Sequence, residues 1–523
     1  MPPFNPLHSH EAPGHRAAPQ SPQDAEREPA TAHVKMVASP AVAIDTWAPT
    51  APTTNINLQA RYMSTVTLPL IDGTKVVVPD SINLITPYVL LEQQDWFEDE
   101  IKFLRKLLRP GQQVIDIGAN YGLYTVSMAA AIGPQGTLWA FEPASSTAAL
   151  LSETLATNGF SHVTLDKRAL SSQAGTARLA LNDNSELNEL IRGNGNTAGQ
   201  SEEVILTTLD DCLQQYGWSD IAFMKIDAEG EEANILKGGQ AFFSRLSPLI
   251  EYEIKAGTTL HLELATAFSV LGYKSYRLVP GLNILVPFNP EEQKPDIYLL
   301  NLFCCKPDRA AQLAADGFLL DEIPALPDTA DNKYRWQNTL AHQPYGKHLQ
   351  SIWKTSAKGA DFKELENALA WYAFSQDSAR RHDLRYAALE RSFNTLRSLC
   401  ASNPSRLRLA SLARVAATYG ERGLAVEALS RLADAILAQK TADPAEPFLS
   451  ASSRYESLAM TQPQVGNWVF SAILEEIERL SAFSSFYAGT SGKQRLEILC
   501  NLGFASPEIF RRLQLIKQRF AMA

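Results

Sequence analysis

The sequence predicts an α/β domain built on a doubly wound, mainly parallel sheet, with an all-α region after it and a disordered tail before it. Between about residues 114 and 305, short apolar strands alternate with helices, which is the pattern of βαβ units. The strand signal stops after Lys306, and ten of the 30 prolines of this 523-residue chain fall within residues 1–60. We expect a tail at 1–60, an α/β domain at 61–306, a linker at 307–360 and a helical domain at 361–523.

The predicted tail contains few large apolar side chains, so burial cannot offset the entropy that ordering would cost. Its histidines could bind a metal weakly, but a solvated tail is the interpretation we favour; they are His8, His10, His15 and His33. The first residues show no charged segment followed by an apolar run, so we expect no secretory signal.

Charge and cysteine content exclude several classes of protein. A net charge of -10 argues against a nucleic-acid partner, because neutralising phosphates needs a basic face. Five cysteines without a C-x-x-C spacing predict neither a disulfide framework nor a structural zinc. No run of about 18 apolar residues predicts a transmembrane helix. These observations favour a cytoplasmic protein.

The individual elements follow from hydrophobic periodicity. Two short apolar runs flank Asp72-Gly73 and predict a hairpin at 66–78, and an amphipathic helix is expected at 96–108. Strands are expected at 114–117, 137–141, 163–165, 222–226, 249–254, 273–278 and 297–303, with a hairpin-like pair at 177–181 and 204–207. Helices are expected at 121–132, 146–158, 231–243 and 260–271. On such a sheet, ligands bind at the carboxyl ends of the strands.

The first sheet strand ends in an acid and a glycine-rich turn, Asp116-Ile117-Gly118-Ala119-Asn120-Tyr121-Gly122. Gly118 permits a tight turn and a close approach of the backbone to a ligand. The spacing differs from the G-x-G-x-x-G of dinucleotide sites, and Asp116 would repel a phosphate. An acid at this position favours a cationic ligand that carries an amine.

The second sheet strand ends in Phe141-Glu142-Pro143, which places Glu142 24 residues after Gly118. An acid at this strand tip is where doubly wound nucleotide sites hold a ribose diol. The alternative is an acid that only stabilises the start of a helix.

The strand that ends at Ile226 is followed by Asp227-Ala228-Glu229. Lys225 and Asp227 point to the same side, and a lysine that leaves an apolar strand needs a partner, for which Asp227 is the natural candidate. Glu229 and its neighbours Glu231 and Glu232 could instead serve as acids at a helix start.

Two further carboxylates, Glu251 and Glu253, share one face of the next strand. They could be a general base and its support. The alternative pairs one of them with Lys225 or Lys255 and leaves the other solvated.

Taken together, these motifs resemble the FkbM family of S-adenosylmethionine-dependent methyltransferases. The matching pieces are Asp116 to Gly122, Phe141 to Pro143, Thr208-Leu209-Asp210-Asp211, Lys225 to Gly230, Leu236-Lys237-Gly238 and Pro248 with Glu253. The resemblance covers about residues 80–305. It implies a Rossmann-like, seven-stranded methyltransferase sheet and methylation of a hydroxyl on a sugar, glycan or secondary metabolite. It implies a cofactor site formed by Asp116, Gly118, Asn120, Tyr121, Gly122, Glu142, Arg168, Ala169 and Asp227.

A hydroxyl is a poor nucleophile, so a base or a metal should assist the transfer. Asp227, Glu229 and Glu253 are the catalytic candidates, with Lys225 as their partner. A divalent cation held by Asp227 and Glu229 is an open alternative, but carboxylates also bind substrate hydroxyls directly, and we predict no dedicated metal site. A second functional hypothesis is a helical scaffold whose α/β domain binds the cofactor without turnover.

The helical region contains the spacing of one tetratricopeptide (TPR) repeat, formed by Leu412, Val415, Ala416, Tyr419, Gly423, Ala428, Leu432 and Ala435. About three repeats are needed for a stable solenoid, so an ordinary bundle stays open. An aromatic stripe that starts at Trp468 is expected in the core. We expect the helical surface to dock a protein partner or the acceptor. The insert 182–200 could be a loop on the substrate side or a flexible connection.

Overall fold

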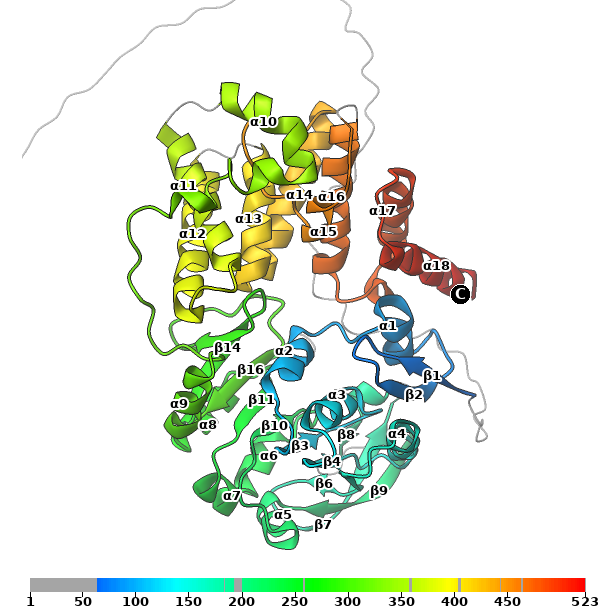
Figure 1. Ribbon diagram of the computed structural model, residues 1–523. Helices are drawn as coiled ribbons and strands as arrows, with labels where there is room; N and C mark the ends of the chain where they lie inside the picture. Colours follow the sequence, from blue (N-terminus) through cyan, green and yellow to red (C-terminus); the bar gives the residue numbers. More distant parts are fainter. Residues whose placement is uncertain are drawn as a thin grey trace, which may run out of the picture. The chain divides into compact units, whose positions relative to one another are not determined.

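A computed structural model describes residues 64–182, 184–191, 200–256, 259–356, 360–402, 406–442, 444–461 and 464–522 (Figure 1). The predicted tail at 1–60, with its four histidines, lies outside these residues, as does much of the insert 182–200. The described chain confirms a mixed α/β region with a large central sheet and a C-terminal helical region. None of its helices is long and apolar enough to cross a membrane.

The described chain begins with the expected hairpin, β1 (Thr65–Pro69) and β2 (Lys75–Pro79), paired antiparallel. Helices α1 (Ile85–Gln93) and α2 (Asp99–Leu107) follow. We did not predict α1 from the sequence. Seven of its nine residues are buried, on all sides of the helix, so it lacks the polar face that makes a helix visible as a periodic pattern.

The central sheet has eight strands in the order β15-β14-β16-β11-β10-β3-β4-β5. Its strands are β3 (Gln113–Ile117), β4 (Thr137–Phe141), β5 (Val163–Asp166), β10 (Phe223–Ile226), β11 (Leu249–Glu253), β14 (Lys274–Val279), β15 (Ile284–Pro287) and β16 (Asn301–Cys305). The five from β11 to β5 are parallel, and β16, β14 and β15 pair antiparallel. This is one strand more than the seven we expected. The additional strand is β15, which forms a hairpin with β14 and was not predicted from the sequence.

Helices cover both faces of this sheet. On one face, α2, α3 (Leu123–Ile132), α4 (Ser145–Asn158) and α9 (Pro307–Ala315) share a core with Val114, Leu138 and Phe223. On the other, α5 (Leu209–Tyr216), α6 (Glu232–Lys237), α7 (Gln240–Arg245) and α8 (Glu263–Val270) pack with the alternate strand residues, such as Ile115 and Met224. The single helix expected at 231–243 is two helices. They separate at Gly238, where a Cβ atom would lie 2.2 Å from the carbonyl oxygen of Ser171.

Smaller sheets flank this unit. One has the order β6-β9-β7-β8, formed by β6 (Ala169–Leu170), β9 (Gln200–Thr207), β7 (Gly175–Leu181) and β8 (Glu189–Leu190), and the other pairs β12 (Lys255–Ala256) with β13 (Thr259–Leu260). In the central sheet, β4 and β5 lie on one side of β3, whereas β10 lies on the other. The direction of winding therefore reverses between β3 and β10, where a crevice opens at the carboxyl ends of the strands.

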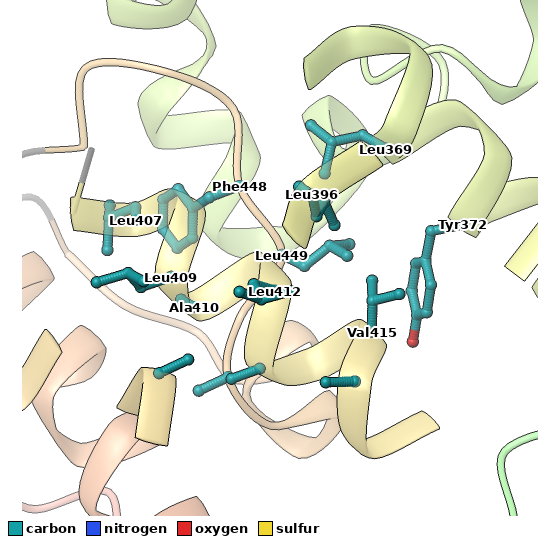
Figure 2. Packing of buried hydrophobic residues seen from close by; sticks show 14 of the residues in the cluster. Leu369, Tyr372, Leu396, Leu407, Leu409, Ala410, Leu412, Val415, Phe448 and Leu449 are labelled. Carbon is teal, nitrogen blue, oxygen red and sulfur yellow. The ribbon is translucent and has the colours of Figure 1, made fainter. Parts of the chain in front are cut away.

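The C-terminal helices are α10 (Pro344–Ser356), α11 (Ala360–Gln376), α12 (His382–Ser402), α13 (Arg406–Tyr419), α14 (Arg422–Gln439), α15 (Ser453–Glu456), α16 (Val465–Ser481), α17 (Thr490–Asn501) and α18 (Pro507–Met522). Leu412 and Val415 of α13 lie in a continuous apolar core with Leu369, Leu396 and Phe448 (Figure 2). Trp468 is fully buried and stacks on Tyr345 at 4.9 Å between ring centroids, which confirms its expected core position. A TPR repeat stays a prediction.

Candidate active site

The carboxyl ends of β3, β4 and β10 surround a cavity of about 1060 Å³, a volume that includes its open mouth. Nine of the residues predicted from the sequence line it: Asp116, Gly118, Asn120, Glu142, Arg168, Ala169, Lys225, Asp227 and Glu229.

Asp116, at the end of β3, is fully buried. Its Oδ2 accepts a hydrogen bond of 2.5 Å from the hydroxyl of Thr125 in α3, and its Oδ1 is buried without a partner among the described residues. Burial raises the pKa of this carboxyl above its usual range. A buried acid with an unsatisfied oxygen in a cavity wall suits a ligand that donates a hydrogen bond or carries a positive charge.

A neighbouring stretch of backbone leaves no room for a side chain at Gly118. We expected its lack of a side chain to admit a ligand. That stays a prediction, but the structure shows a second reason for glycine: with φ at 80°, a Cβ atom would point to the end of β10 and lie 1.7 Å from the carbonyl oxygen of Asp227. This contact fixes how closely the turn after β3 approaches the turn after β10.

Glu142 lies beside this turn at the end of β4. Its Oε2 accepts from the backbone N–H of Asn120 and its Oε1 from that of Ala144, both at 2.9 Å. Burial raises the pKa of Glu142 to about 7. Each carboxylate oxygen has a second lone pair, so Glu142 retains acceptor capacity towards a ligand in the cavity.

Arg168 follows β5 and is paired within the protein. Its guanidinium forms a fork on Asp166, with Nη2 2.5 Å from Oδ2, and also donates to Gln215 at 2.8 Å. Its neighbour Ala169 is 7% exposed. Both line the cavity.

Three carboxylates gather beyond β10 and β11. Single oxygens of Asp227, Glu229 and Glu253 all lie within 4.8 Å of one another. The ammonium of Lys225 lies 2.5 Å from Asp227 Oδ2, as its position on the strand predicts. Desolvation and the neighbouring Asp227 raise the pKa of Glu229 and that of Glu253 well above the usual range of a carboxyl group, which favours their protonated forms.

Tyr124, in the first turns of α3, links two more acids that we did not predict to act together. Its hydroxyl lies 3.0 Å from Glu251 Oε1 and also contacts Glu98 Oε2, and the Lys225 ammonium lies 4.7 Å from its ring centroid. A phenol has one proton to donate, so one of the two carboxyls must be protonated when both contacts form. Burial raises the pKa of both.

Three predicted residues do not line the cavity. Tyr121 packs in a separate apolar cluster with Leu68 and Val76. Gly122 precedes α3 with φ at 95°, where a Cβ atom would lie 2.5 Å from Leu151. Glu253 does not line the cavity itself, but it lies close to Asp227 and Glu229, which do. For Tyr121 and Gly122 the structure shows a role in packing the turn.

Several residues that line the cavity are not among the predicted site residues: Thr86, Trp96, Glu98, Tyr124, Ser185, Glu186 and Asn188. The last three belong to the insert 182–200, for which a loop on the substrate side was one of the two alternatives. Ser185 donates to Asn120 Oδ1 at 2.9 Å, and Thr86 donates to Glu186. These segments lie far from the motif strands in the chain, so no local spacing reveals them. Tyr124 could have been found from its place in the first helix after the glycine-rich turn.

Comparison with known proteins agrees with this geometry. Residues 116–275 match the family model described as the methyltransferase FkbM domain. The match includes the carboxyl end of β3 and all of β4 and β10, whose ends form the cavity, and it confirms the resemblance for this segment. No curated protein matches the chain.

Three solved structures are more distantly similar. A SAM-dependent O-methyltransferase from Thermotoga maritima is 15% identical, with 46% of this chain and 77% of that chain covered and a TM-score of 0.24. A SAM-dependent methyltransferase from Aquifex aeolicus is 14% identical, with 42% and 92% covered and a TM-score of 0.24. A precorrin-6y C5,15-methyltransferase from Geobacter metallireducens is 12% identical, with 40% and 86% covered and a TM-score of 0.22. The family-model match supports the methyltransferase function; these likenesses do not extend it.

Proposed function

We propose that this protein is an S-adenosylmethionine-dependent O-methyltransferase that acts on a hydroxyl of a sugar, glycan or secondary metabolite. The observation that supports it is the convergence of Asp116, Glu142 and Asp227, from three strand ends, on one cavity inside the segment that matches the FkbM domain.

The β3–β4 side of the cavity suits the cofactor. Asp116 presents a buried oxygen without a partner to a cationic amine, and Glu142 offers its remaining lone pairs to ribose hydroxyls. Gly118, Asn120, Arg168 and Ala169 line the same side, while Tyr121 and Gly122 shape the turn. When bound, S-adenosylmethionine supplies an electrophilic methyl group on a positively charged sulfur.

The β10–β11 side suits the acceptor. Asp227, partly exposed and hydrogen-bonded to Lys225, is the group we assign to accept the proton that an acceptor hydroxyl loses. Burial raises the pKa of Glu229 and of Glu253, and in their protonated forms they can donate hydrogen bonds to neighbouring hydroxyls. Lys225 positions Asp227. These groups hold the acceptor in line, which is a large part of the rate enhancement available to such a transfer.

A divalent cation held by Asp227 and Glu229 stays a prediction. The oxygens of these residues and Glu253 are close enough to share an ion, and carboxylates are suitable ligands for Mg²⁺. Removal of divalent ions with EDTA, followed by addition of Mg²⁺, tests it: full activity after EDTA would exclude a metal requirement.

The function is tested by transfer of a radiolabelled methyl group to crude cell-surface glycan and to small hydroxylated metabolites. We expect Asp116→Ala to abolish binding of S-adenosylhomocysteine. We expect Asp227→Asn to suppress turnover while affinity for S-adenosylhomocysteine stays within about tenfold. Binding without transfer to any acceptor would favour a cofactor-binding scaffold, and equal loss of both in Asp227→Asn would move this residue to the cofactor site.

Three further expectations belong to this proposal. Crosslinking in cells tests whether the helical region docks a protein partner. Cell fractionation tests the cytoplasmic location. The boundaries at 60/61, 306/307 and 360/361 are tested by limited proteolysis: cleavage near them would support the predicted domains, whereas protection at 306/307, where α9 begins and packs on the sheet, would move that boundary.

A further inference from the structure

The C-terminal helical region contacts helix α1 of the α/β region, and the buried carboxylate of Glu92 takes part in this contact. The backbone N–H of Ser485 donates to Glu92 Oε2 at 3.0 Å, and the Ser485 hydroxyl donates to the same oxygen. From α18, Arg512 lies 3.4 Å from Glu92 Oε1 and Arg511 donates to the Glu92 backbone carbonyl at 2.8 Å. The Glu92 carboxylate, which is 0% exposed, thus has hydrogen-bond and ion-pair partners that come from the C-terminal part of the chain.

Aromatic contacts strengthen the same junction. The rings of Tyr88 in α1 and Phe486 meet edge to face at 5.3 Å, and the guanidinium of Arg519 lies 3.8 Å from the centroid of Phe486. The Tyr88 hydroxyl is 3.0 Å from the hydroxyl of Ser485. The C-terminal half of α1 is therefore held by the helical region.

The N-terminal end of α1 holds the wall of the cavity. Thr86 donates a hydrogen bond to Glu186, and the backbone N–H of Ile85 donates to Asn184 Oδ1 at 3.3 Å. Ser185, between them, donates to Asn120 in the turn after β3. Thr86, Ser185 and Glu186 all line the cavity.

We propose that the helical region positions residues 184–188 of the cavity wall through α1, so that Ser485, Glu92 and Thr86 are positioning residues of the site. A nine-residue helix is marginal in isolation and takes its place from the surfaces that it contacts. Helix α1 contacts the helical region at one end and the wall at the other, so displacement at the first contact moves the second. This coupling goes beyond the proposed function and does not depend on it.

The test is hydrogen exchange in the full-length protein, with two variants that act at opposite ends of α1. Ser485→Ala removes a hydroxyl bonded to Glu92 and Tyr88, and Thr86→Val removes the donor to Glu186 with little change of shape. Ser392→Ala is the matched control, because this buried serine of the helical region makes one hydrogen bond, to Ala368, away from α1.

We expect Ser485→Ala to raise the hydrogen-exchange rate about fivefold in two sets of peptides, those that cover 85–93 and those that cover 184–191. Thr86→Val should raise the rate by a similar factor in the peptides that cover 184–191. Peptides of β3 should not change, and Ser392→Ala should leave all these segments within twofold. Faster exchange at 85–93 without any change at 184–191 in Ser485→Ala would overturn the coupling. So would unchanged exchange at 184–191 in Thr86→Val, which covers the case in which Ser485→Ala fails to fold.

A second measurement uses S-adenosylhomocysteine as the probe. If the wall supports Asn120, both variants should weaken its binding about threefold to tenfold, whereas Ser392→Ala should not. Failure of the wild-type protein to bind the probe would count against the proposed function alone, because the exchange experiment needs no ligand.

Discussion

Buried acids have different surroundings in the two regions of the molecule. In the helical region, Glu475 is 1% exposed and receives a fork from Arg454, with Nη2 2.7 Å from Oε2, and Glu478 is paired with Arg495. At the end of the sheet, Asp116 and Glu251 are equally buried, but each has an oxygen without a hydrogen-bond partner among the described residues. Burial raises the pKa of both, and the nearby charge of Lys225 opposes this rise.

The difference separates charges that support folding from charges that are available to a ligand. Glu476 of the helical region also has an oxygen without a hydrogen bond, yet Arg479 and Arg414 lie near it. The acids at the sheet end share one lysine instead of having an arginine each. A positively charged cofactor would supply charge that this end of the sheet lacks.

The largest expected effect is on stability. Glu475→Ala should lower the free energy of unfolding by about 3–5 kcal/mol, because it leaves Arg454 and Tyr455 without their shared partner. Glu251→Gln should change the free energy of unfolding by less than about 1 kcal/mol or increase it. The substitution removes a charge that burial disfavours, and the glutamine keeps an acceptor for Tyr124. Denaturant unfolding measures both. Equal losses would show that the sheet-end acids also support folding.

The second prediction concerns the backbone that holds these acids together. Gly118→Ala should lower the free energy of unfolding by about 2–3 kcal/mol and weaken binding of S-adenosylhomocysteine, because the added Cβ would push the turn after β3 away from Asp227. Gly217→Ala is the control: its φ is similar, at 65°, but no atom lies within 4 Å of the new Cβ. Gly217→Ala should lower the free energy of unfolding by only about 1 kcal/mol and should bind S-adenosylhomocysteine as the wild-type protein does. Equal losses of stability in the two variants would mean that the left-handed backbone conformation, and not the contact with Asp227, is the reason that residue 118 is a glycine.

Much of the sheet and its ligand edge follows from the sequence. Parallel strands place their carboxyl ends at one edge, so polar residues that directly follow apolar runs can be assigned to that edge without a structure. Asp116, Glu142 and Asp227 were predicted in this way, and the structure places all three along the cavity. Their roles stay predictions.

The other parts of the site depend on contacts that a local pattern does not contain. Helix α1 has no polar face, and it reaches the cavity through Thr86 only because the hairpin before it and α18 hold it there. Glu98 and Glu251 are 153 residues apart and meet through the hydroxyl of Tyr124. The close approach of the Asp227 backbone to Gly118 could not be predicted either, because it is a property of the folded sheet.

The smallest expected effect is a pH dependence that belongs to the sheet end. With a pKa of about 7, Glu142 is protonated in acid and can then accept fewer hydrogen bonds from a ribose. Binding of S-adenosylhomocysteine should therefore weaken as pH falls below 7, by at most about tenfold per pH unit. Glu142→Gln should bind more weakly at pH 8 and lose this part of the dependence.

The stability of the ligand-free protein should respond in the opposite sense. The pKa of Glu142 is raised from 4.5, so its ionisation disfavours the folded state, and its contribution to the free energy of unfolding falls as pH rises from about 4.5 to 7. Calorimetric titration and denaturant unfolding across pH 5 to 8, in wild type and Glu142→Gln, measure the two trends. Binding that strengthens in acid would place Glu142 outside the cofactor site and would leave Asp116 as the acid that meets the ligand.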